Sequence, residues 1–310
     1  MTRMRANAEG IRLRGPSRAA EAFDEVCTLL RPVPRGGGKF IGGTPSVTWG
    51  VPYGGLLVAQ ALAAAAESVP EGFWVRSLHA YFIEAGASSR NVEIDVVSVR
   101  DGRSTCWRSV RVRQDERLLL TVELTFALDA NGPAHQAPMP PARAPEQCLN
   151  VGVALADFDD VHDYWNDESA FDLRYVADPP RLAAAGTAET QPRSAVWVRA
   201  MGADPDDRAL NSALLAYASD MCMLDPVLKP HGLWWGSSSA TGFSMDHSMW
   251  FHAPARTDEW MLLDQHSPAL RDGRGLAIAD LFTRSGSLLC TVAQQGAMRI
   301  RTGVPGPTPS

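Results

Sequence analysis

The chain has 310 residues and a net charge of −6, with 45% hydrophobic and 21% charged residues. This composition is typical of a globular protein and excludes a wholly disordered chain. No apolar run reaches the roughly 18 residues of a membrane span. No secretory signal follows the arginine-rich start, and no basic stripe suggests nucleic-acid binding. The five cysteines are far apart and form no Cys-x-x-Cys pair, which argues against structural zinc and favours a reducing cytoplasm.

The first half of the chain predicts helices followed by a run of strands. A short helix is expected at 17–30. A second helix begins after Tyr53-Gly54-Gly55, runs to Ala66 and is apolar on almost every side, so it should be buried. Four strands follow, at 74–84, 92–100, 105–113 and 118–128. A long helix followed by an antiparallel run of strands indicates an α+β fold.

The second half repeats this order after a proline-rich linker at 131–146 and an acidic surface segment at 155–168. We expect a strand at 194–200, a helix at 207–223, and strands at 243–251, 260–266, 276–283 and 288–294. The predicted organisation is an N-terminal extension (1–35), a first domain (36–130), a linker (131–170), a second domain (171–302) and a disordered tail (303–310).

Short segments of the first half recur in the second half. Arg-Asp-Gly-Arg and Leu-Leu-x-Thr-Val both appear twice, and a Gly-Gly-Leu-Leu segment has a looser counterpart. The pairs are 100–103 with 271–274, 118–122 with 288–292, and 54–57 with 212–215. Because the matches keep their order and nearly constant spacing, we infer two copies of one fold joined by the linker.

Two positions of this repeat become polar in the second copy only. Gln294 takes the place of Leu124, and Asp220 takes the place of Leu62. Burying an amide side chain without hydrogen-bond partners costs a few kcal/mol of folding free energy. A carboxylate near the end of a helix is also opposed by the helix dipole. Asp220 and Gln294 therefore need either a hydrogen-bond network or a catalytic use.

The segment 244–252 carries the densest polar chemistry, with an Asp-His pair and two histidines that suggest a metal site or a triad. On a strand, however, His247 and His252 would point to opposite faces, so joint metal ligation is not expected. The chain has no Gly-x-Ser-x-Gly elbow, phosphate loop or Gly-x-Gly-x-x-Gly motif, which disfavours an α/β serine hydrolase and a nucleotide-binding protein.

At several of these places the chain resembles the acyl-CoA thioesterase II family. The Asp-His-Ser-Met-Trp-Phe-His run is the most specific motif. The resembling segments are 53–55 with its helix, 77–82, 100–104, 217–220, 246–252 and 294–299. The resemblance spans about 40–300 and implies an α+β double hotdog fold, in which two long helices are each wrapped by an antiparallel sheet.

The same resemblance implies hydrolysis of an acyl-CoA, or of an acyl-carrier thioester, to a free acid, as in fatty acid metabolism. In this family an Asp, a Thr and a Gln orient the attacking water. Asp220 and Gln294 match the family, and Ser244 stands at the Thr position. The family also implies a homo-oligomer, and no metal or other cofactor is expected.

The residues themselves suggest how such a site would work. Asp220 can accept the proton of a water that Gln294 and Ser244 hold in line. Backbone N–H groups at Gly54 and Gly55, at the start of the first buried helix, can stabilise an oxyanion.

Two alternatives remain open. One is a hotdog hydratase or dehydratase with Asp246 and His247 as its acid–base pair, although adjacent strand residues diverge. The other is a catalytically weak protein that binds acyl thioesters, because Ser244 lacks the β-methyl group that stiffens a threonine rotamer.

Overall fold

The computed structural model describes residues 16–158, 169–184, 191–202 and 206–300. In the first half, helix α1 (Pro16–Leu29) precedes the hairpin β1 (Val33–Gly36) and β2 (Lys39–Gly42). The buried helix α2 (Gly54–Ala66) then leads into four strands: β3 (Trp74–Phe82), β4 (Val92–Asp101), β5 (Thr105–Gln114) and β6 (Arg117–Ala127).

The second half starts with short elements: a 3-10 turn at Pro145–Gln147, α3 (Val151–Ala154), β7 (Phe171–Tyr175) and α4 (Pro180–Leu182). Its long helix is α5, and it contributes seven strands to the sheet. The remaining elements are β8 (Arg193–Ala200), α5 (Arg208–Ser219), α6 (Asp225–Leu228), a 3-10 turn at Lys229–His231, β9 (Ala240–Ser244), β10 (Asp246–Phe251), β11 (Met261–Arg271), β12 (Arg274–Thr283) and β13 (Leu288–Ile300).

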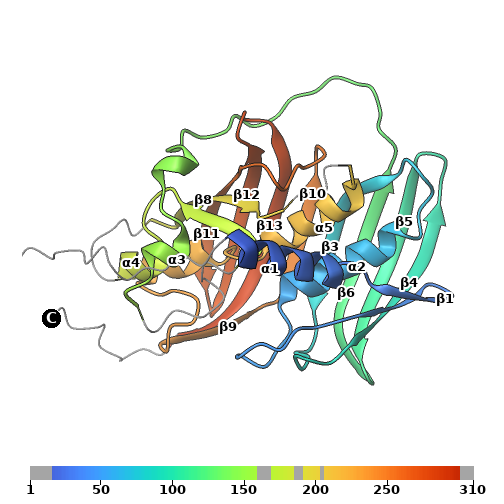
Figure 1. Cartoon of the computed structure of the whole chain (residues 1–310), viewed down its shortest axis with the longest axis horizontal. Coiled ribbons are helices and arrows are strands. Elements are labelled where there is room, and N and C mark those ends of the chain that lie inside the picture. Colours follow the sequence, from blue (N-terminus) through green and yellow to red (C-terminus); the bar gives the residue numbers. More distant parts are fainter. Residues whose placement is uncertain (1–15, 159–168, 185–190, 203–205, 301–310) are drawn as a thin grey trace, which may run out of the picture.

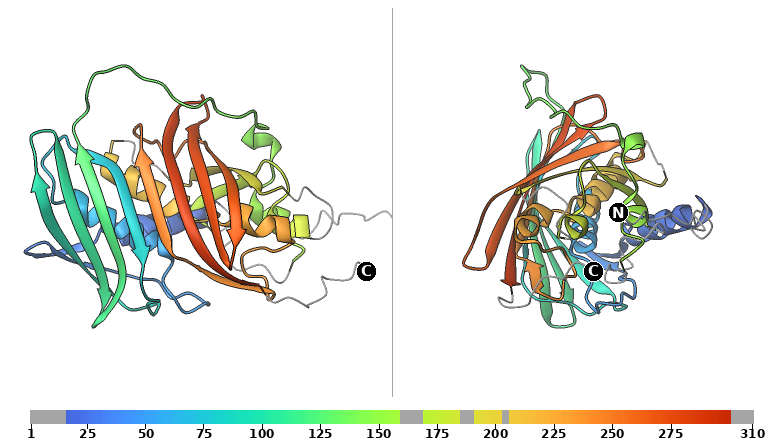
Figure 2. Two further views of the ribbon diagram at one scale, coloured as in Figure 1. Left: turned by 180° about the vertical axis from the view of Figure 1, so that it is seen from behind. Right: turned by 90° about the vertical axis from the view of Figure 1, so that its left-hand side faces the viewer.

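The thirteen strands of the described residues form one antiparallel sheet with the order β1-β2-β4-β5-β6-β3-β10-β13-β12-β11-β8-β7, and β9 pairs with the far end of β13. The two halves meet where β3 pairs with β10, with Leu78 opposite Met249 and Ala80 opposite His247. The helices lie on the concave side of this sheet (Figures 1 and 2). Each half is thus a long helix wrapped by a sheet, so the predicted α+β double hotdog fold is confirmed.

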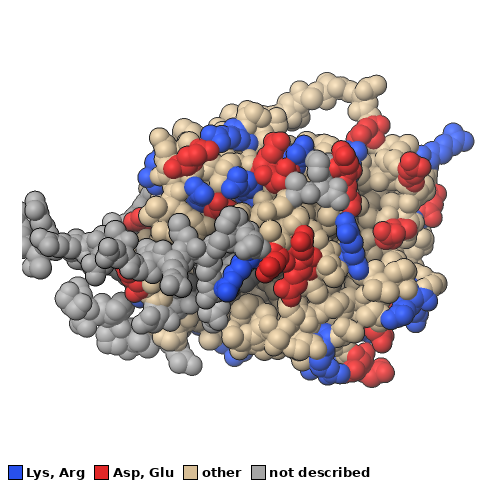
Figure 3. All heavy atoms as spheres, in the orientation of Figure 1, with Lys and Arg blue, Asp and Glu red and all other residues tan. Residues whose placement is uncertain are grey.

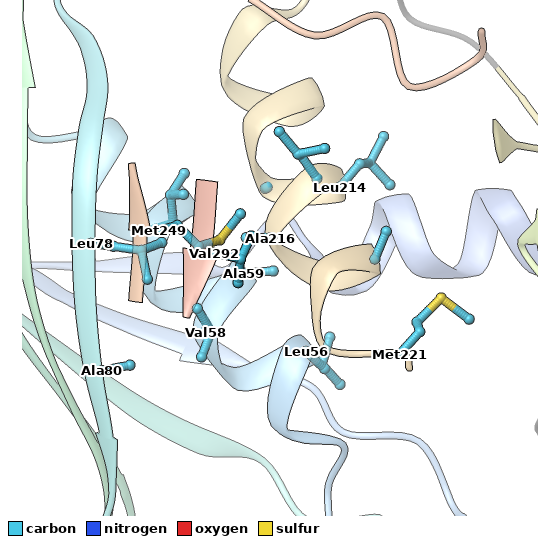
Figure 4. Packing of buried hydrophobic residues seen from close by; sticks show 14 of the residues in the cluster. Leu56, Val58, Ala59, Leu78, Ala80, Leu214, Ala216, Met221, Met249 and Val292 are labelled. Atoms are coloured by element: carbon cyan, nitrogen blue, oxygen red, sulfur yellow. The ribbon is translucent and has the colours of Figure 1, made fainter. Parts of the chain in front are cut away.

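Helices α2 and α5 pack against each other at the centre of the molecule, between the halves (Figure 4). Small residues make this approach close: a Cβ at Gly55 would lie 2.7 Å from the backbone oxygen of Tyr217. Apolar side chains of both helices join those of the central strands in one continuous core. Because the core crosses the junction, each half buries its helix partly against the other half.

Several element boundaries differ from the prediction. The helix expected to end at 223 ends at Ser219, because the chain tightens into i→i−3 turns (Met221 N to Ala218 O, Asp225 N to Cys222 O) before α6. The strand expected at 243–251 is two strands that break at Met245, whose N–H bonds to the carbonyl oxygen of Gln295. Strands β1, β2 and β7 were not predicted, since each has only four or five residues.

The repeated Asp-Gly turns are not identical. Asp272 and Gly273 adopt φ of 52° and 70°, the left-handed conformation expected of a tight hairpin. Asp101 and Gly102 do not adopt that conformation. The proline-rich linker lies along the second half, where Gln136 Nε2 donates to Gly286 O at 2.7 Å and Trp197 Nε1 donates to Arg143 O at 2.7 Å.

Part of the predicted organisation falls on undescribed residues. The start of the N-terminal extension, most of the acidic segment and the expected disordered tail lie outside the described residues. The domain boundaries at 36–130 and 171–302 stay a prediction. Among the described residues, no helix is both long and apolar enough to cross a membrane. Acidic and basic side chains are mixed over the face shown in Figure 3.

Candidate active site

A cavity of about 890 Å³ lies between the two halves of the molecule. The first half contributes the start of α2, including Gly54, and the loop after β3. The second half contributes the turn after α5 and strand β9. Asp220, Ser244 and Gln294, which the sequence analysis singled out, all border this cavity. The structure therefore brings the three predicted residues together on one wall.

Asp220 is the C-cap residue of α5, so its carboxylate sits at the unfavourable end of the helix dipole. The start of α2 compensates for this, because the backbone N–H of Gly55 donates to the Asp220 carboxylate. A Cβ at Gly54 would lie 3.0 Å from Asp220 Oδ2. Glycine at this position lets the first half approach the carboxylate of the second.

Gln294 bridges the other two residues. Its Nε2 donates to Asp220 Oδ1 at 2.8 Å and to Ser244 Oγ at 2.7 Å. Its side chain points inward because Gln294 shares strand parity with the buried residues Cys290 and Val292, and it is only 1% exposed. Asp220 and Gln294 thus form a hydrogen-bond network, one of the two explanations that their sequence positions call for.

Ser244 is the last residue of β9 and is partly buried. β9 pairs with β13 so that Ser244 lies opposite Gly296, two residues beyond Gln294. This register brings the hydroxyl to the Gln294 amide. Because the Ser244 hydroxyl accepts a hydrogen bond from Gln294, its own O–H remains available to donate to a molecule in the cavity.

Burial raises the pKa of Asp220 above its ordinary value, and the hydrogen bonds from Gln294 and from the backbone N–H of Gly55 partly oppose this rise. A raised pKa makes this carboxylate a stronger base than an exposed aspartate. Burial lowers the pKa of His247, so its imidazole is neutral near pH 7.

His247 also belongs to this network, although its sequence position does not predict it. His247 is fully buried, and its Nδ1 lies 2.6 Å from Gln294 Oε1. From the sequence, His247 is weighed as a metal ligand with His252 and as an acid–base partner of Asp246. In the structure Asp246 instead accepts the N–H of Gln295 through Oδ1 at 2.9 Å. The two residues do not form a pair in the cavity, which removes the basis of the hydratase alternative.

The two predicted oxyanion residues have different surroundings. Gly54 borders the cavity, whereas the N–H of Gly55 is engaged by the Asp220 carboxylate. Gly55 therefore holds the carboxylate, and of the two glycines only Gly54 borders the cavity. Leu62 and Leu124, which stand where Asp220 and Gln294 stand in the second half, are each 1% exposed and belong to the apolar core.

The comparisons with known proteins point to one family. Residues 44–127 match the acyl-CoA thioesterase N-terminal domain, and residues 145–298 match the acyl-CoA thioesterase C-terminal domain. Acyl-coenzyme A thioesterase 8 of Homo sapiens is 34% identical over 269 residues, which cover 81% of this chain and 82% of that protein. Acyl-CoA thioesterase 2 of Haemophilus influenzae is 31% identical over 254 residues, with 80% and 87% covered.

Solved structures agree with these relatives. The crystal structure of an acyl-CoA thioesterase II from Mycobacterium marinum is 29% identical, with a TM-score of 0.72, and the match covers 91% of this chain and all of that one. The prediction of a thioester hydrolase of this class is thus confirmed. Both halves match domains of one enzyme family, and the chain belongs to the acyl-CoA thioesterase family.

Proposed function

We propose that this chain hydrolyses acyl-CoA thioesters with a water molecule held by Asp220, Gln294 and Ser244. The single observation that supports the proposal most is the hydrogen-bonded chain Asp220–Gln294–Ser244 on the wall of a large cavity. The relatives at 34% and 31% identity are acyl-CoA thioesterases by name. Thioester hydrolysis, the activity in these names, fits a site in which a base activates water directly and no covalent enzyme intermediate forms.

In the proposed reaction, Asp220 takes a proton from the water as the water oxygen attacks the thioester carbonyl carbon. The tetrahedral intermediate carries its negative charge near the start of α2, where the N–H of Gly54 is the proposed donor. The C–S bond then breaks, and the proton passes from Asp220 to the thiolate sulfur. The products are the free acid and CoA.

The cavity offers an apolar wall for the acyl chain. The side chains that line it include Leu57, Phe82, Leu119, Met221, Leu224 and Met298. These residues come from both halves, so a bound chain would lie across the junction between the domains. Burial of the acyl chain against them supplies binding energy, while the polar groups on the wall orient the thioester.

Assembly and location are also proposals. The sheet ends in the short edge strands β1 and β7, and exposed edges favour pairing with another chain. We propose a homo-oligomer, for which light scattering should give a mass above 33.5 kDa. The five cysteines are all buried and none forms a disulfide, which supports a reducing compartment such as the cytoplasm.

A panel of acyl-CoAs, assayed for free thiol, tests the proposed function. Release of one thiol per acid formed is the expected result, and the Gln294→Ala variant should release thiol far more slowly. Binding of acyl-CoA without thiol release would instead support a weak binding protein. Hydration of an unsaturated acyl-CoA without thiol release would support the hydratase alternative.

A further inference from the structure

His247 makes two hydrogen bonds that connect α5 to the proposed catalytic amide. It lies in β10 and is 0% exposed. Its Nδ1 is 2.6 Å from Gln294 Oε1, and its Nε2 is 2.9 Å from Ser219 Oγ. The residues that border the cavity, among those the structure describes, do not include His247. It can therefore act on the reaction only through the side chains it contacts.

The hydrogen atoms of this network can be assigned from its chemistry. The Asp220 carboxylate only accepts, so the Gln294 NH₂ group must face it and Oε1 must face His247. An amide oxygen also only accepts, so His247 Nδ1 carries the proton and donates. The unprotonated Nε2 then accepts the single proton of the Ser219 hydroxyl, which it shares with the backbone oxygen of Ala216, also 2.9 Å from Ser219 Oγ.

The bond from His247 matters most when Asp220 has taken a proton. A protonated carboxyl is both a donor and an acceptor, so it no longer forces the Gln294 NH₂ group toward itself. A turned amide would present its oxygen to the water site and withdraw the donor from Ser244. The Nδ1–H of His247 opposes that turn, because it needs the amide oxygen on its own side.

The repeat shows that this network was built in one half only. In the first half Leu78 pairs with Leu124, and the register of β10 with β13, continued by one residue pair, sets His247 beside Gln294. Because Gln294 takes the place of Leu124, His247 takes the place of Leu78. The helix register likewise places Ser219 on Ala61. The four first-half counterparts of Ser219, Asp220, His247 and Gln294 are thus Ala61, Leu62, Leu78 and Leu124, all at most 1% exposed. The second half therefore carries four polar side chains at positions where the first half carries buried apolar ones. Because the four positions differ together, we assign His247 and Ser219 to the same site as Asp220 and Gln294.

We propose that His247 is a positioning residue that fixes the Gln294 amide, so that both Gln294 N–H groups stay directed at Asp220 and Ser244. This inference rests on the proposed function, because it assigns His247 an effect on hydrolysis through Gln294. Ser219 is the residue that holds the imidazole from the other side.

Two substitutions of His247 separate the hydrogen bond from packing. His247→Leu installs the residue found at the related position 78 and removes the donor. His247→Asn keeps an N–H donor close to the position of Nδ1. We expect His247→Leu to lower kcat by about tenfold to 10²-fold with little change in KM, as for other losses of alignment. His247→Asn should recover most of kcat. The exposed His252, which bonds to Thr291, provides the matched control, and His252→Leu should keep the wild-type kcat.

A double-mutant cycle then tests whether His247 acts through Gln294. If it does, His247→Leu in the Gln294→Ala background should cause no further loss of kcat. Additive losses would overturn the proposal, and so would a His247→Leu protein with wild-type kcat. If His247→Leu does not fold, Ser219→Ala decides: a lowered kcat supports the proposal and a wild-type kcat overturns it. A Gln294→Ala protein that keeps its activity would instead contradict the proposed function itself.

Discussion

Gln294 Nε2 lies 2.8 Å from Asp220 Oδ1, although the two residues are 74 positions apart in the chain. The contact joins the end of α5 to the middle of β13 and faces the start of α2 from the other half. It satisfies a buried amide and a dipole-opposed carboxylate at once. The same contact leaves both groups on the wall of the cavity, where they can reach a water molecule.

Ser244 is expected to set how firmly that water is held. Ser244→Ala removes the hydroxyl that accepts from Gln294, so kcat should fall while the melting temperature stays near the wild-type value. Ser244→Thr should match or exceed the wild-type kcat, because the added methyl group restricts the rotamer. Steady-state thiol-release assays measure both effects.

Ser248 is the matched control for this pair of variants. Its hydroxyl bonds to His79, away from the cavity, so Ser248→Ala should leave kcat unchanged. An Ser244→Ala enzyme that turns over as fast as the wild type would remove Ser244 from the site.

The sequence predicted the parts of this structure that depend on periodicity and on the repeat. The apolar helix at 54–66 and the alternating strand ending near 127 were predictable because each buries one continuous set of side chains. The pairing of Asp220 with Gln294 was predictable because both break the same repeat. His247 was missed, because finding its counterpart Leu78 requires the registers of β3 with β6 and of β10 with β13. The role of Gly55 was missed for a similar reason, since its contact with Asp220 joins the two halves.

One active site per chain is expected, because the first half carries leucines at the positions of Asp220 and Gln294. A non-hydrolysable thioether analogue of acyl-CoA should bind with a stoichiometry of one per chain in isothermal titration calorimetry. Two equivalent sites per chain would show that the first half binds acyl-CoA independently and would contradict this account.

Asp225 is expected to make stability depend on pH. It is buried and accepts from the Tyr175 hydroxyl at 2.5 Å. Burial raises its pKa from 3.8 to about 7, against the opposing effects of Tyr175 and Lys229. The folded state therefore binds this proton more tightly than the unfolded state. The stability that Asp225 contributes is complete below pH 3.8 and is lost as pH rises through about 7.

Asp225→Asn cannot ionise, so its free energy of unfolding should rise relative to the wild type, by about 3 kcal/mol between pH 5 and pH 8. Urea unfolding of both proteins across that range measures this difference. A pH-independent difference for Asp225→Asn would show that this carboxyl does not titrate in that window.

Asp220→Asn tests the central claim most directly, because it keeps the shape of the side chain and removes the base. Turnover, binding of the thioether analogue and melting temperature should be measured on one purified preparation, with Asp264→Asn, a partly buried aspartate of β11, as the control. We expect turnover to fall by about 10²–10⁴-fold with nearly unchanged binding. The melting temperature should hold or rise, since burial raises the pKa of Asp220 and thus opposes its ionised form. A destabilised Asp220→Asn protein with full activity would contradict the assignment of Asp220 as the catalytic base.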